Sequence, residues 1–565
     1  MILLDAYAAR SCAVKTHNTF DPGVTLVAGP IDEGLQELFD QGQEFEDQQV
    51  AQLLAAVPGL VDLREVEDRA EAARRLRAAT ADGVVGVVGG SLPVDAAGHR
   101  VGRVDLLLRG PDRHDGSAGY LPVEIKRHRV LERRRAKTDS PAAWLAPFHS
   151  PTAAVETLDR RFRYGSREGD LVQLAHYWRM LEAAGLAAGG EPWVGVIGND
   201  PEPGGVITWV RLDAPVARTF SRTADTGWVR RSILERYDHE FAFRLDVAEV
   251  AAHQGEADAR PPLVEPIRVD ECARCPWWEY CRSAMDADDL SLRLDKGPLD
   301  VREISVLRRR GIGTVTELAA ADLAELLPGY LAEVTHRDNA ESRIRTAHRR
   351  AVMLADGTPL ARTTQGAIAV PTAPVEIDFD LEASADQHVY LWGFLVNDGD
   401  SSSYVPFAEF SDLDDDGEVA LAVRALTWLR TQVVEHGATV HHYSGYEVSQ
   451  LVKLAERSPE HEVLQWACEA TGHDFVDLYE VVKRHWFGVA GLGLKQVATQ
   501  GAGFSWRDED PGGLNSQTWF QEAVHGEDEA TRLEARNRVL AYNEDDVTAT
   551  REVRRWLRAQ SAKIN

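Results

Sequence analysis

The chain lacks any long uninterrupted run of apolar residues. A membrane-spanning helix needs roughly 18 continuous apolar residues, and no stretch of the sequence approaches that length. The first residues, 1–5, also lack the basic segment and the long apolar core of a signal peptide. The sequence therefore predicts a cytoplasmic protein with no membrane partner.

The sequence also lacks a GxxxxGK[ST] phosphate-binding motif, internal repeats and long low-complexity segments. Without that motif the chain is not expected to carry an ATP-driven motor of its own. Hydrophobic residues nevertheless make up 44% of the 565 residues, which is enough for large packed cores. At about 150 residues per domain, this length corresponds to roughly three domains. Helical and strand patterns alternate along the chain, so we expect an α/β multidomain protein.

Basic residues are outnumbered by acidic ones, and the net charge is −28. This balance argues against a nucleic-acid partner, because phosphates attract Lys and Arg. Net charge, however, does not say where the charges lie. Each charged run alone is commonly a solvated face, but the basic runs cluster around one candidate site, which favours a functional surface. The acidic runs lie at 412–418 and 527–529, and the basic runs at 126–129, 133–135, 160–161 and 343–350.

In the first half of the chain, one carboxylate lies in an apolar strand pattern and a second precedes a lysine in another. Asp105 lies in the strand predicted over 102–108, and Glu124 and Lys126 in the strand predicted over 121–126. Residues two apart in a strand share a face, so Glu124 and Lys126 point together. If the strands pair, Asp105 and Glu124 can bind one Mg²⁺, which prefers carboxylate oxygens. The ion would polarise a scissile phosphate and activate a water, and Lys126 would hold that water or stabilise the developing charge.

Strands often carry charges by chance, so this pattern alone is not specific. Three neighbouring features strengthen it. Gln173 and Tyr177 lie four residues apart in a predicted helix and therefore share a face. Glu46, four residues after Gly42 in the first predicted helix, is a further potential metal ligand. The basic run begins at Lys126 itself.

In this order the motifs resemble those of the RecB-like branch of the PD-(D/E)xK nucleases. That family has a helical GxxxH, then a strand Asp, then ExK, then QxxxY. Glu46 stands where the family usually has His, which leaves the metal preference and the role of Glu46 open. The resemblance implies a restriction-endonuclease-like α/β core over residues 1–290. The matching residues are Gly42 with Glu46, Asp105, Glu124 with Lys126, and Gln173 with Tyr177.

The chain has five cysteines, and three of them are close together. Cys272, Cys275 and Cys281 follow a C-x₂-C-x₅-C spacing, and Cys12 lies near the start of the same predicted domain. In a reducing compartment this spacing indicates a metal site rather than disulfides, and four thiolates suit zinc as well as an iron–sulfur cluster. One remote and three clustered cysteines resemble the iron–sulfur nucleases of the RecB type. That resemblance implies a [4Fe–4S] cluster that joins the two ends of the domain, with Cys12 beside the other three, whereas Cys468 is expected in a core.

Residues 291–365 are expected to form a small helical connector. Helices are predicted over 301–309 and 315–327, joined at a Gly-Ile-Gly segment over 311–313. This pattern resembles a helix-hairpin-helix, a module that presents backbone N–H groups at a helix N-terminus to phosphate. A plain helical connector is the alternative interpretation.

Residues 366–565 show a second α/β pattern. The strand predicted over 375–382 alternates acidic and apolar residues, so Asp378, Asp380 and Glu382 share a face. An exposed edge strand would also alternate. However, an edge strand rarely stacks three like charges without a counter-ion, which favours a functional site.

Two later segments add acidic residues to this pattern. Glu447 follows a strand predicted over 438–443. The long helix predicted over 529–557 carries Tyr542 and Asp546 on one face, because they lie four residues apart.

This set resembles the DEDD exonucleases of the RNase H-like fold, in the subtype with a Tyr before the last Asp. Asp380 and Glu382 match the first motif, and Tyr542 and Asp546 match the last. Glu447 stands where the middle motif has Asp, so a nucleic-acid-binding remnant is an alternative to a working exonuclease. The resemblance implies an RNase H-like domain whose four carboxylates hold two Mg²⁺ or Mn²⁺ ions about 4 Å apart, with Tyr542 orienting the attacking water.

Together the two resemblances imply a metal-dependent nuclease, of exonuclease type, that hydrolyses DNA in repair or end processing. The combination also resembles a bacterial family of nucleases in which some relatives carry a helicase, so a helicase partner is expected. The alternative is a nucleic-acid-binding or assembly subunit with one or both sites inactive, since Glu46 and Glu447 depart from the family patterns. An RNA substrate also stays open, because RNase H-like sites act on either polymer.

Overall fold

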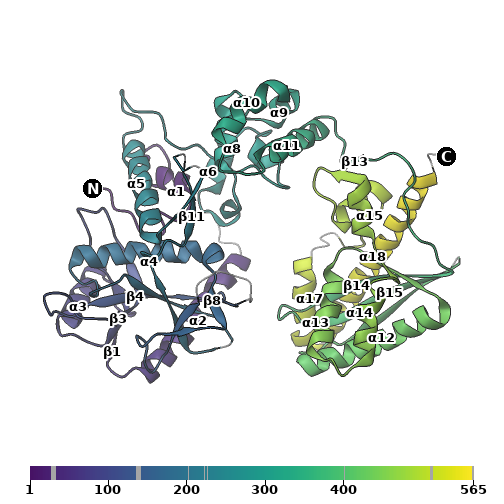
Figure 1. Ribbon diagram of the computed structural model, residues 1–565, viewed down its shortest axis with the longest axis horizontal. Helices are drawn as coiled ribbons and strands as arrows, with labels where there is room; N and C mark the ends of the chain where they lie inside the picture. The colour runs from purple at the N-terminus through teal and green to yellow at the C-terminus, as the bar shows by residue number, and fades with distance from the viewer. Residues whose placement is uncertain are drawn as a thin grey trace. The chain divides into compact units, whose positions relative to one another are not determined.

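The chain forms two compact units (Figure 1). In the computed structural model the first unit, called the N-terminal unit below, comprises Met1–Leu292, Asp300–Arg310 and Ala324–Glu341. The second, called the C-terminal unit, comprises Arg293–Leu299, Gly311–Leu323 and Ser342–Asn565. Arg135, the last residue of one predicted basic run, lies outside the described residues. The structure describes residues 1–26, 33–134, 142–201, 203–221, 223–224, 227–399, 401–508 and 513–562.

An eight-stranded sheet forms the centre of the N-terminal unit, in the order β1-β2-β3-β4-β9-β10-β6-β7. Strands β2, β3 and β4 are antiparallel neighbours, and β4 runs parallel to β9. Because β4 lies inside the sheet, it is buried from its start to Ile125. The strands are β1 (Leu60–Asp62), β2 (Gly86–Ser91), β3 (Arg103–Arg109), β4 (Tyr120–Lys126), β6 (Ala143–Pro147), β7 (Val155–Thr157), β9 (Trp193–Gly198) and β10 (Val206–Arg211).

Helix α4 crosses this sheet and packs against β4 (Figure 1). It begins at Tyr164, nine residues before Gln173, and Gly185 in the left-handed conformation (φ 66°) ends it. Helix α5 packs against α4 and begins at a capping box formed by Ser232 and Glu235. Two small two-stranded sheets, β5–β8 and β11–β12, lie outside the main sheet. The elements are α1 (Ala13–Phe20), α2 (Glu33–Ala56), α3 (Arg69–Ala81), α4 (Tyr164–Ala184), α5 (Ile233–Ala252), β5 (Leu131–Arg133), β8 (Arg160–Phe162), β11 (Ala217–Phe220) and β12 (Trp228–Arg231).

The segment expected as a connector, 291–365, is divided between the two units. The helix predicted over 315–327 is two helices, because Ala321 adopts an extended conformation and ends α9. Glu317 caps α9 and accepts hydrogen bonds from the N–H groups of Gly313 (2.7 Å) and Thr314 (3.0 Å). These groups, which a helix-hairpin-helix would offer to phosphate, therefore already have an acceptor within the chain. The helices are α8 (Val301–Arg309), α9 (Val315–Ala320), α10 (Leu323–Glu333) and α11 (Ala340–Ala355).

A five-stranded mixed sheet forms the centre of the C-terminal unit, in the order β16-β15-β14-β17-β18. Strand β14 is central, antiparallel to β15 and parallel to β17. Helix α18 packs against β14 and β15, and α12 also packs against β15. The elements are β14 (Val375–Ala383), β15 (Val389–Asp398), β16 (Ser401–Ala408), β17 (Thr439–His442), β18 (Phe475–Asp477), α12 (Asp415–His436), α13 (Tyr446–Arg457), α14 (Glu462–Ala470), α15 (Leu478–His485), α16 (Leu494–Val497), α17 (Gly513–His525) and α18 (Glu529–Ala562).

The alternating residues of β14 separate two environments. Ile377, Phe379 and Leu381 lie in the apolar core that α12, α13 and α14 complete. On the opposite face, Arg554 of α18 donates to both oxygens of Asp378, at 3.0 and 2.7 Å. Asp378, which the sequence pattern grouped with the next two acidic residues, is therefore held in a buried structural ion pair.

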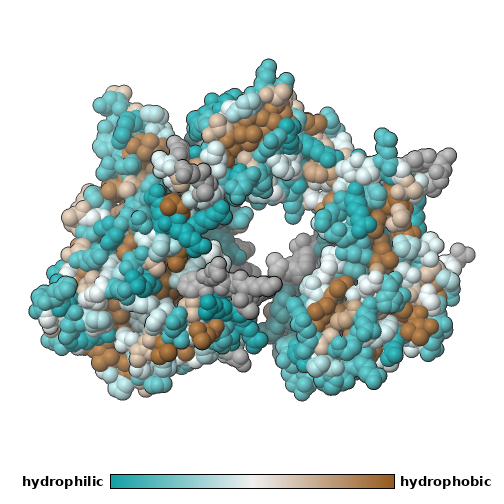
Figure 2. All heavy atoms as spheres, in the orientation of Figure 1, coloured by the Kyte–Doolittle hydropathy of each residue, from teal (hydrophilic) through white to brown (hydrophobic). Residues whose placement is uncertain are grey.

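Within the described residues, no helix combines the length and the apolar character that a membrane crossing requires. Figure 2 shows hydrophilic side chains over most of the visible face, with smaller hydrophobic areas between them. This surface agrees with the high content of charged residues, 27% of the chain.

Candidate functional site

Three carboxylates of the C-terminal unit converge between β14 and α18. Asp380 and Glu382 come from β14 and Asp546 from α18, and each contributes one oxygen to a group within 4.8 Å. Burial and Asp546 raise the pKa of Glu382 to about 8, and burial raises the pKa of Asp546 to about 6. Burial together with the neighbouring carboxylates raises the pKa of Asp380 well above its usual range. The three groups therefore repel one another as anions, and a hard cation would relieve that repulsion.

Each of these carboxylates is oriented by a neutral donor. Ser516 Oγ donates to Glu382 Oε2 at 2.9 Å, and Trp506 Nε1 donates to Asp546 Oδ1 at 2.7 Å. Asn543 Nδ2 donates to Asp380 Oδ2 at 2.8 Å. Such bonds fix the direction of potential ligands without neutralising their charge.

Tyr542 lies one turn before Asp546 on α18, and Lys495 of α16 donates to its hydroxyl group at 3.0 Å. Burial and the carboxylates raise the pKa of Tyr542, so the phenol stays protonated at neutral pH. The charge of Lys495 opposes the effect of burial on the pKa of Asp546 and of Glu382. Lys495 could not be identified from the sequence, because a single lysine in a four-residue helix carries no periodic signal.

Glu447, expected as a further ligand, lies beside this group but not within it. It is 3% exposed, and its charge contributes to the raised pKa of Asp380. Glu447 Oε2 is 3.5 Å from His442 Nδ1 and has no hydrogen-bond partner in the described part of the chain. Burial raises the pKa of Glu447, and His442 opposes that shift.

In the N-terminal unit, Asp105 and Glu124 face each other across β3 and β4. The antiparallel register pairs Leu106 with Val123, so Asp105 and Glu124 form the next pair outward. Asp105 Oδ2 accepts a hydrogen bond from the Ile125 N–H at 2.8 Å. Burial and Asp105 raise the pKa of Glu124, which is 1% exposed, to about 8. Glu124 Oε1 is buried without a hydrogen-bond partner among the described residues, as a ligand atom awaiting a cation would be.

The other oxygen of Glu124 belongs to a hydrogen-bonded chain. Lys126 Nζ donates to Glu124 Oε2 (2.5 Å) and to Gln173 Oε1 (3.2 Å). Gln173 Nε2 donates to Glu124 Oε2 (2.9 Å) and to the Tyr177 hydroxyl (3.2 Å). Burial opposes the charge of Lys126, but the nearby carboxylates raise its pKa, so the ammonium form persists. Arg10, which the sequence analysis did not identify, also donates to Gln173 Oε1, at 2.7 Å.

Glu46 approaches this cluster from α2. Burial, Asp105 and Asp47 raise the pKa of Glu46 to about 7, so its carboxylate lies within electrostatic reach of Asp105. Within the described residues, however, Glu46, Asp105 and Glu124 do not bring their oxygens within 4.8 Å of one another. The N-terminal carboxylates are therefore spaced more widely than those of the C-terminal unit. A Cβ at Gly42 would meet nothing within 4 Å, so packing does not explain that glycine.

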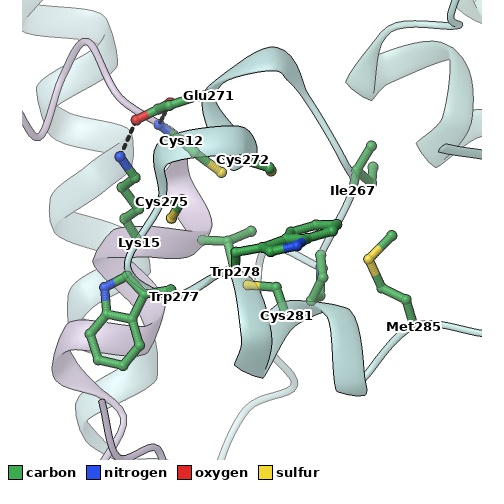
Figure 3. A pocket seen from close by; sticks show the side chains of 12 residues that line it. Cys12, Lys15, Ile267, Glu271, Cys272, Cys275, Trp277, Trp278, Cys281 and Met285 are labelled. Atoms are coloured by element: carbon green, nitrogen blue, oxygen red, sulfur yellow. Dashed lines mark hydrogen bonds and ion pairs between the residues drawn. The ribbon is translucent and has the colours of Figure 1, made fainter. Parts of the chain in front are cut away.

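Four of the five cysteines line one pocket of the N-terminal unit (Figure 3). Cys12 precedes α1, whereas Cys272, Cys275 and Cys281 lie in and beside the short helices η1 (Asp270–Arg274) and α6 (Trp278–Ser283). All are free thiols, and no three of their sulfur atoms lie within 4.8 Å of one another. Tetrahedral zinc with bonds of about 2.3 Å needs sulfur atoms roughly 3.8 Å apart, so the observed spacing is wider than a zinc site. Cys468 packs against the C-terminal core.

A second group of potential ligands in the C-terminal unit already has a partner. His388, Asp415 and Glu418 lie within 4.8 Å of one another. Arg457 pairs with Asp415 at 2.7 Å and also with Glu418, and the Val389 N–H donates to Glu418 at 2.7 Å. This group is therefore a charge-paired surface contact rather than a metal site.

Comparison with known families gives one match. Residues 377–558 match the family model of the RNase H superfamily, a range that contains Asp380, Glu382, Glu447 and Asp546. This likeness is consistent with a nuclease-type hydrolase that acts on nucleic acid. No match was found among curated proteins or among solved structures. The chain is thus a mixed α/β multidomain protein with an RNase H-like C-terminal region.

Proposed function

We propose that the chain is a nuclease, dependent on Mg²⁺ or Mn²⁺, that hydrolyses phosphodiester bonds of DNA. The observation that carries this proposal is the buried group of Asp380, Glu382 and Asp546 within the RNase H-like region. Three ionisable oxygens within 4.8 Å are costly in a folded core unless they serve a cation. RNase H-like nucleases usually use such ions.

In the C-terminal site, the three carboxylates would hold the ion and Glu447 would complete the set. When bound, the ion would polarise the scissile phosphate and lower the pKa of a water. Lys495 donates to the Tyr542 oxygen at 3.0 Å, which holds the phenol beside Asp546. Tyr542 would thereby orient that water.

We propose a second nuclease site at Asp105, Glu124 and Lys126, with Glu46 as an additional ligand. The observation that favours it is the buried, unpartnered Oε1 of Glu124. Lys126 would hold the attacking water or stabilise the charge that develops on the phosphate. Gln173 and Tyr177 would hold the lysine in place through the hydrogen bonds described above.

We further propose that the four-cysteine pocket holds a [4Fe–4S] cluster. Four free thiols around one pocket and sulfur atoms spaced more widely than zinc needs support this assignment. When bound, the cluster would join the segment before α1 to the η1–α6 segment, which is a structural role.

The proposed pathway is repair or processing of DNA ends by exonuclease action. Because the sequence has no ATP-binding motif, unwinding of duplex DNA would come from a helicase partner. A nucleic-acid-binding or assembly subunit with inactive sites is the alternative, favoured by the replacement residues Glu46 and Glu447.

The test is degradation of end-labelled single-stranded DNA, duplex DNA and RNA with Mg²⁺, Mn²⁺ or EDTA, using protein purified without oxygen. Wild type is compared with Asp546→Asn, Lys126→Ala and the double variant. We expect metal-dependent cleavage by the wild type and none by the double variant. Each single variant identifies the contribution of the other site, and the product ladder gives the polarity. If wild type binds DNA but never cleaves it, the nuclease proposal is wrong and the binding-subunit alternative replaces it.

A further inference from the structure

An arginine-rich pocket lies next to the N-terminal carboxylates. It is open, has a volume of about 490 Å³ and follows directly on the end of β4. The connection from β4 to β5, the paired strands β5 and β8 and the residue preceding α4 all contribute to it. Its charged lining residues are Arg129, Glu132, Arg133, Arg160, Arg163 and Asp200.

Its two acidic residues are engaged elsewhere. The oxygens of Asp200 accept hydrogen bonds from the backbone N–H groups of Val130 and Leu131, both at 3.1 Å. Glu132 pairs with Arg161 at 3.0 Å. Arg161 balances Glu132, so the four lining arginines outweigh the remaining negative charge of Asp200.

Two of the arginines have no counter-ion among the described residues. In the part of the chain that the structure describes, the side chains of Arg129 and Arg163 form no ion pair or hydrogen bond. A third, Arg160, contacts Asp159 at 3.3 Å, and Asp159 is 72% exposed. Guanidinium groups without partners, gathered around a concave surface, suit an anion with several oxygens.

The β5–β8 strand pair supplies a second, independent observation. Strand β5 pairs with β8 so that Glu132 lies opposite Arg161, a complementary pair, but Arg133 lies directly opposite Arg160. Like charges directly opposite each other destabilise a strand pair. A bound anion at this position would turn the repulsive pair into a favourable one.

We propose that this pocket binds the phosphodiester backbone of nucleic acid and presents that strand to the Glu124–Lys126 site. The inference rests on the proposed nuclease function and names where the substrate is held. Arg129 follows Lys126 by three residues, so their Cα atoms lie at most about 11 Å apart. A nucleic-acid strand rises roughly 3.4 Å per nucleotide, so a phosphate at Arg129 lies within about three nucleotides of the lysine.

The pocket and the carboxylate site share one frame. Arg167 of α4 donates to the Arg129 carbonyl at 3.0 Å, and His128 Nε2 lies 2.8 Å from Asp170 Oδ2 of the same helix. Helix α4 also carries Gln173, which contacts Lys126 and Glu124. A strand bound in the pocket would therefore be held at a fixed position relative to the carboxylates. The local positive charge of the pocket would allow this binding although the whole chain has a net charge of −28.

The test is binding of fluorescently labelled single-stranded and duplex DNA by the full chain in EDTA, measured by anisotropy over a range of salt concentrations. The variant Arg129→Gln/Arg163→Gln removes two potential phosphate contacts. We expect the variant to bind DNA at least about tenfold more weakly than wild type. The plot of log K against log salt should also become less steep, by about 1.4 for single strands or 1.8 for duplex. The form of DNA, single-stranded or duplex, whose binding is weakened more by the variant is the form that the pocket binds.

The matched control is Arg74→Gln/Arg75→Gln. It removes the same charge from two exposed arginines of α3, which pair with Glu71 rather than line the pocket. We expect this control to leave the salt slope unchanged, because its arginines lie outside the pocket. A general effect of net charge would instead change the slope equally in both variants. Equal losses in both would overturn the inference.

Arg133→Glu separates binding from folding. Opposite Arg160 it replaces a repulsive pair by a complementary one, so we expect the thermal midpoint to stay the same or rise while DNA binding falls. If wild type binds DNA and both Arg133→Glu and the double glutamine variant bind it equally well, the pocket assignment is wrong. The nuclease proposal then stays intact. No DNA binding by wild type would overturn both. Binding of an acidic protein but not of DNA would also contradict the inference.

Discussion

The two carboxylate sites differ in how their negative charge is balanced. In the N-terminal unit, Lys126 lies directly on Glu124 at 2.5 Å. In the C-terminal unit, Lys495, whose charge lowers the pKa of Glu382 and Asp546, contacts the Tyr542 hydroxyl instead. The C-terminal carboxylates are therefore closer together and less neutralised by the protein itself.

This difference has a consequence for metal binding. A cation that enters the N-terminal site meets a carboxylate whose charge is already shared with an ammonium group, whereas one entering the C-terminal site meets three mutually repelling acids. Because Coulomb attraction rises with the uncompensated charge, we expect the C-terminal site to bind Mg²⁺ or Mn²⁺ more tightly. The N-terminal site would need a higher metal concentration to reach the same occupancy.

The largest expected effect is on the C-terminal site. Asp546→Asn removes one of three charges from the ion-binding group, and we expect cleavage by this site to fall about a thousandfold, as loss of several kcal/mol of transition-state stabilisation implies. The measurement is single-turnover cleavage of labelled DNA in a Lys126→Ala background, so that the other site does not contribute. Asp545→Asn is the control, since Asp545 bonds to Arg507. A tenfold or smaller loss in Asp546→Asn would remove this residue from the ion-binding group.

The cysteine pocket distinguishes the N-terminal unit further. We expect Cys12→Ser to lose most of the bound iron and to lower the thermal midpoint of this unit by roughly 5 °C or more, because metal binding contributes directly to folding. Metal analysis and differential scanning calorimetry of anaerobically purified protein measure both effects. Cys468→Ser, which changes a cysteine in the other unit, should change neither. Zinc at one equivalent in the wild type would contradict the iron–sulfur assignment.

A smaller effect separates the roles of the two lysines. We expect Lys495→Met to lower the cleavage rate of the C-terminal site about tenfold to a hundredfold, because Tyr542 loses the donor that holds its hydroxyl group in place. Metal affinity should not fall, since a nearby positive charge is removed. Tyr542→Phe should cause a similar loss, and the double variant should lose little more, because the two residues act through one contact. Fully additive losses would show that Lys495 acts independently of Tyr542.

The periodic parts of both sites were predictable from the sequence. Alternation along β14 predicted a strand with an acidic face, and the four-residue spacing of Tyr542 and Asp546 predicted their shared helix face. Strand patterns around Asp105 and Glu124 likewise predicted two strands, which are antiparallel neighbours. These features depend on local backbone geometry, which repeats every two or 3.6 residues.

The remaining features depend on contacts between distant segments. Asp378 has the same local pattern as Asp380, but α18 brings Arg554 to the one and Asn543 to the other. Arg10 meets Gln173 across 163 positions of sequence. Periodicity carries no information about such pairings, because they are set by which helix covers which strand.

The smallest expected effect is on stability in acid, and it concerns one buried histidine in each unit. Burial lowers the pKa of His176 to about 3, and burial with the charge of Arg554 lowers the pKa of His441 to about 3. His176 lies 2.9 Å from the Tyr237 hydroxyl and 3.2 Å from the Val101 carbonyl. Neither ring nitrogen of His441 has a hydrogen-bond partner within the described residues.

Both histidines should make their units less stable in acid. The unfolded chain binds a proton near pH 6.5 and the folded state only near pH 3, so stability is complete above pH 6.5 and is lost as the pH falls. Each histidine should lower the free energy of unfolding by about 2 kcal/mol between pH 6.5 and 5.

The carboxylates with raised pKa values have the opposite effect on stability in part of this range. The measured quantity is therefore the difference in unfolding free energy between wild type and a variant lacking one histidine. In urea unfolding at pH 7 we expect His441→Leu to cost little stability. His176→Leu should lose about 1–3 kcal/mol at pH 7, because the Val101 carbonyl and the hydroxyl proton of Tyr237 lose their partner. Equal costs at pH 7 would mean that the hydrogen bonds of His176 contribute nothing to stability.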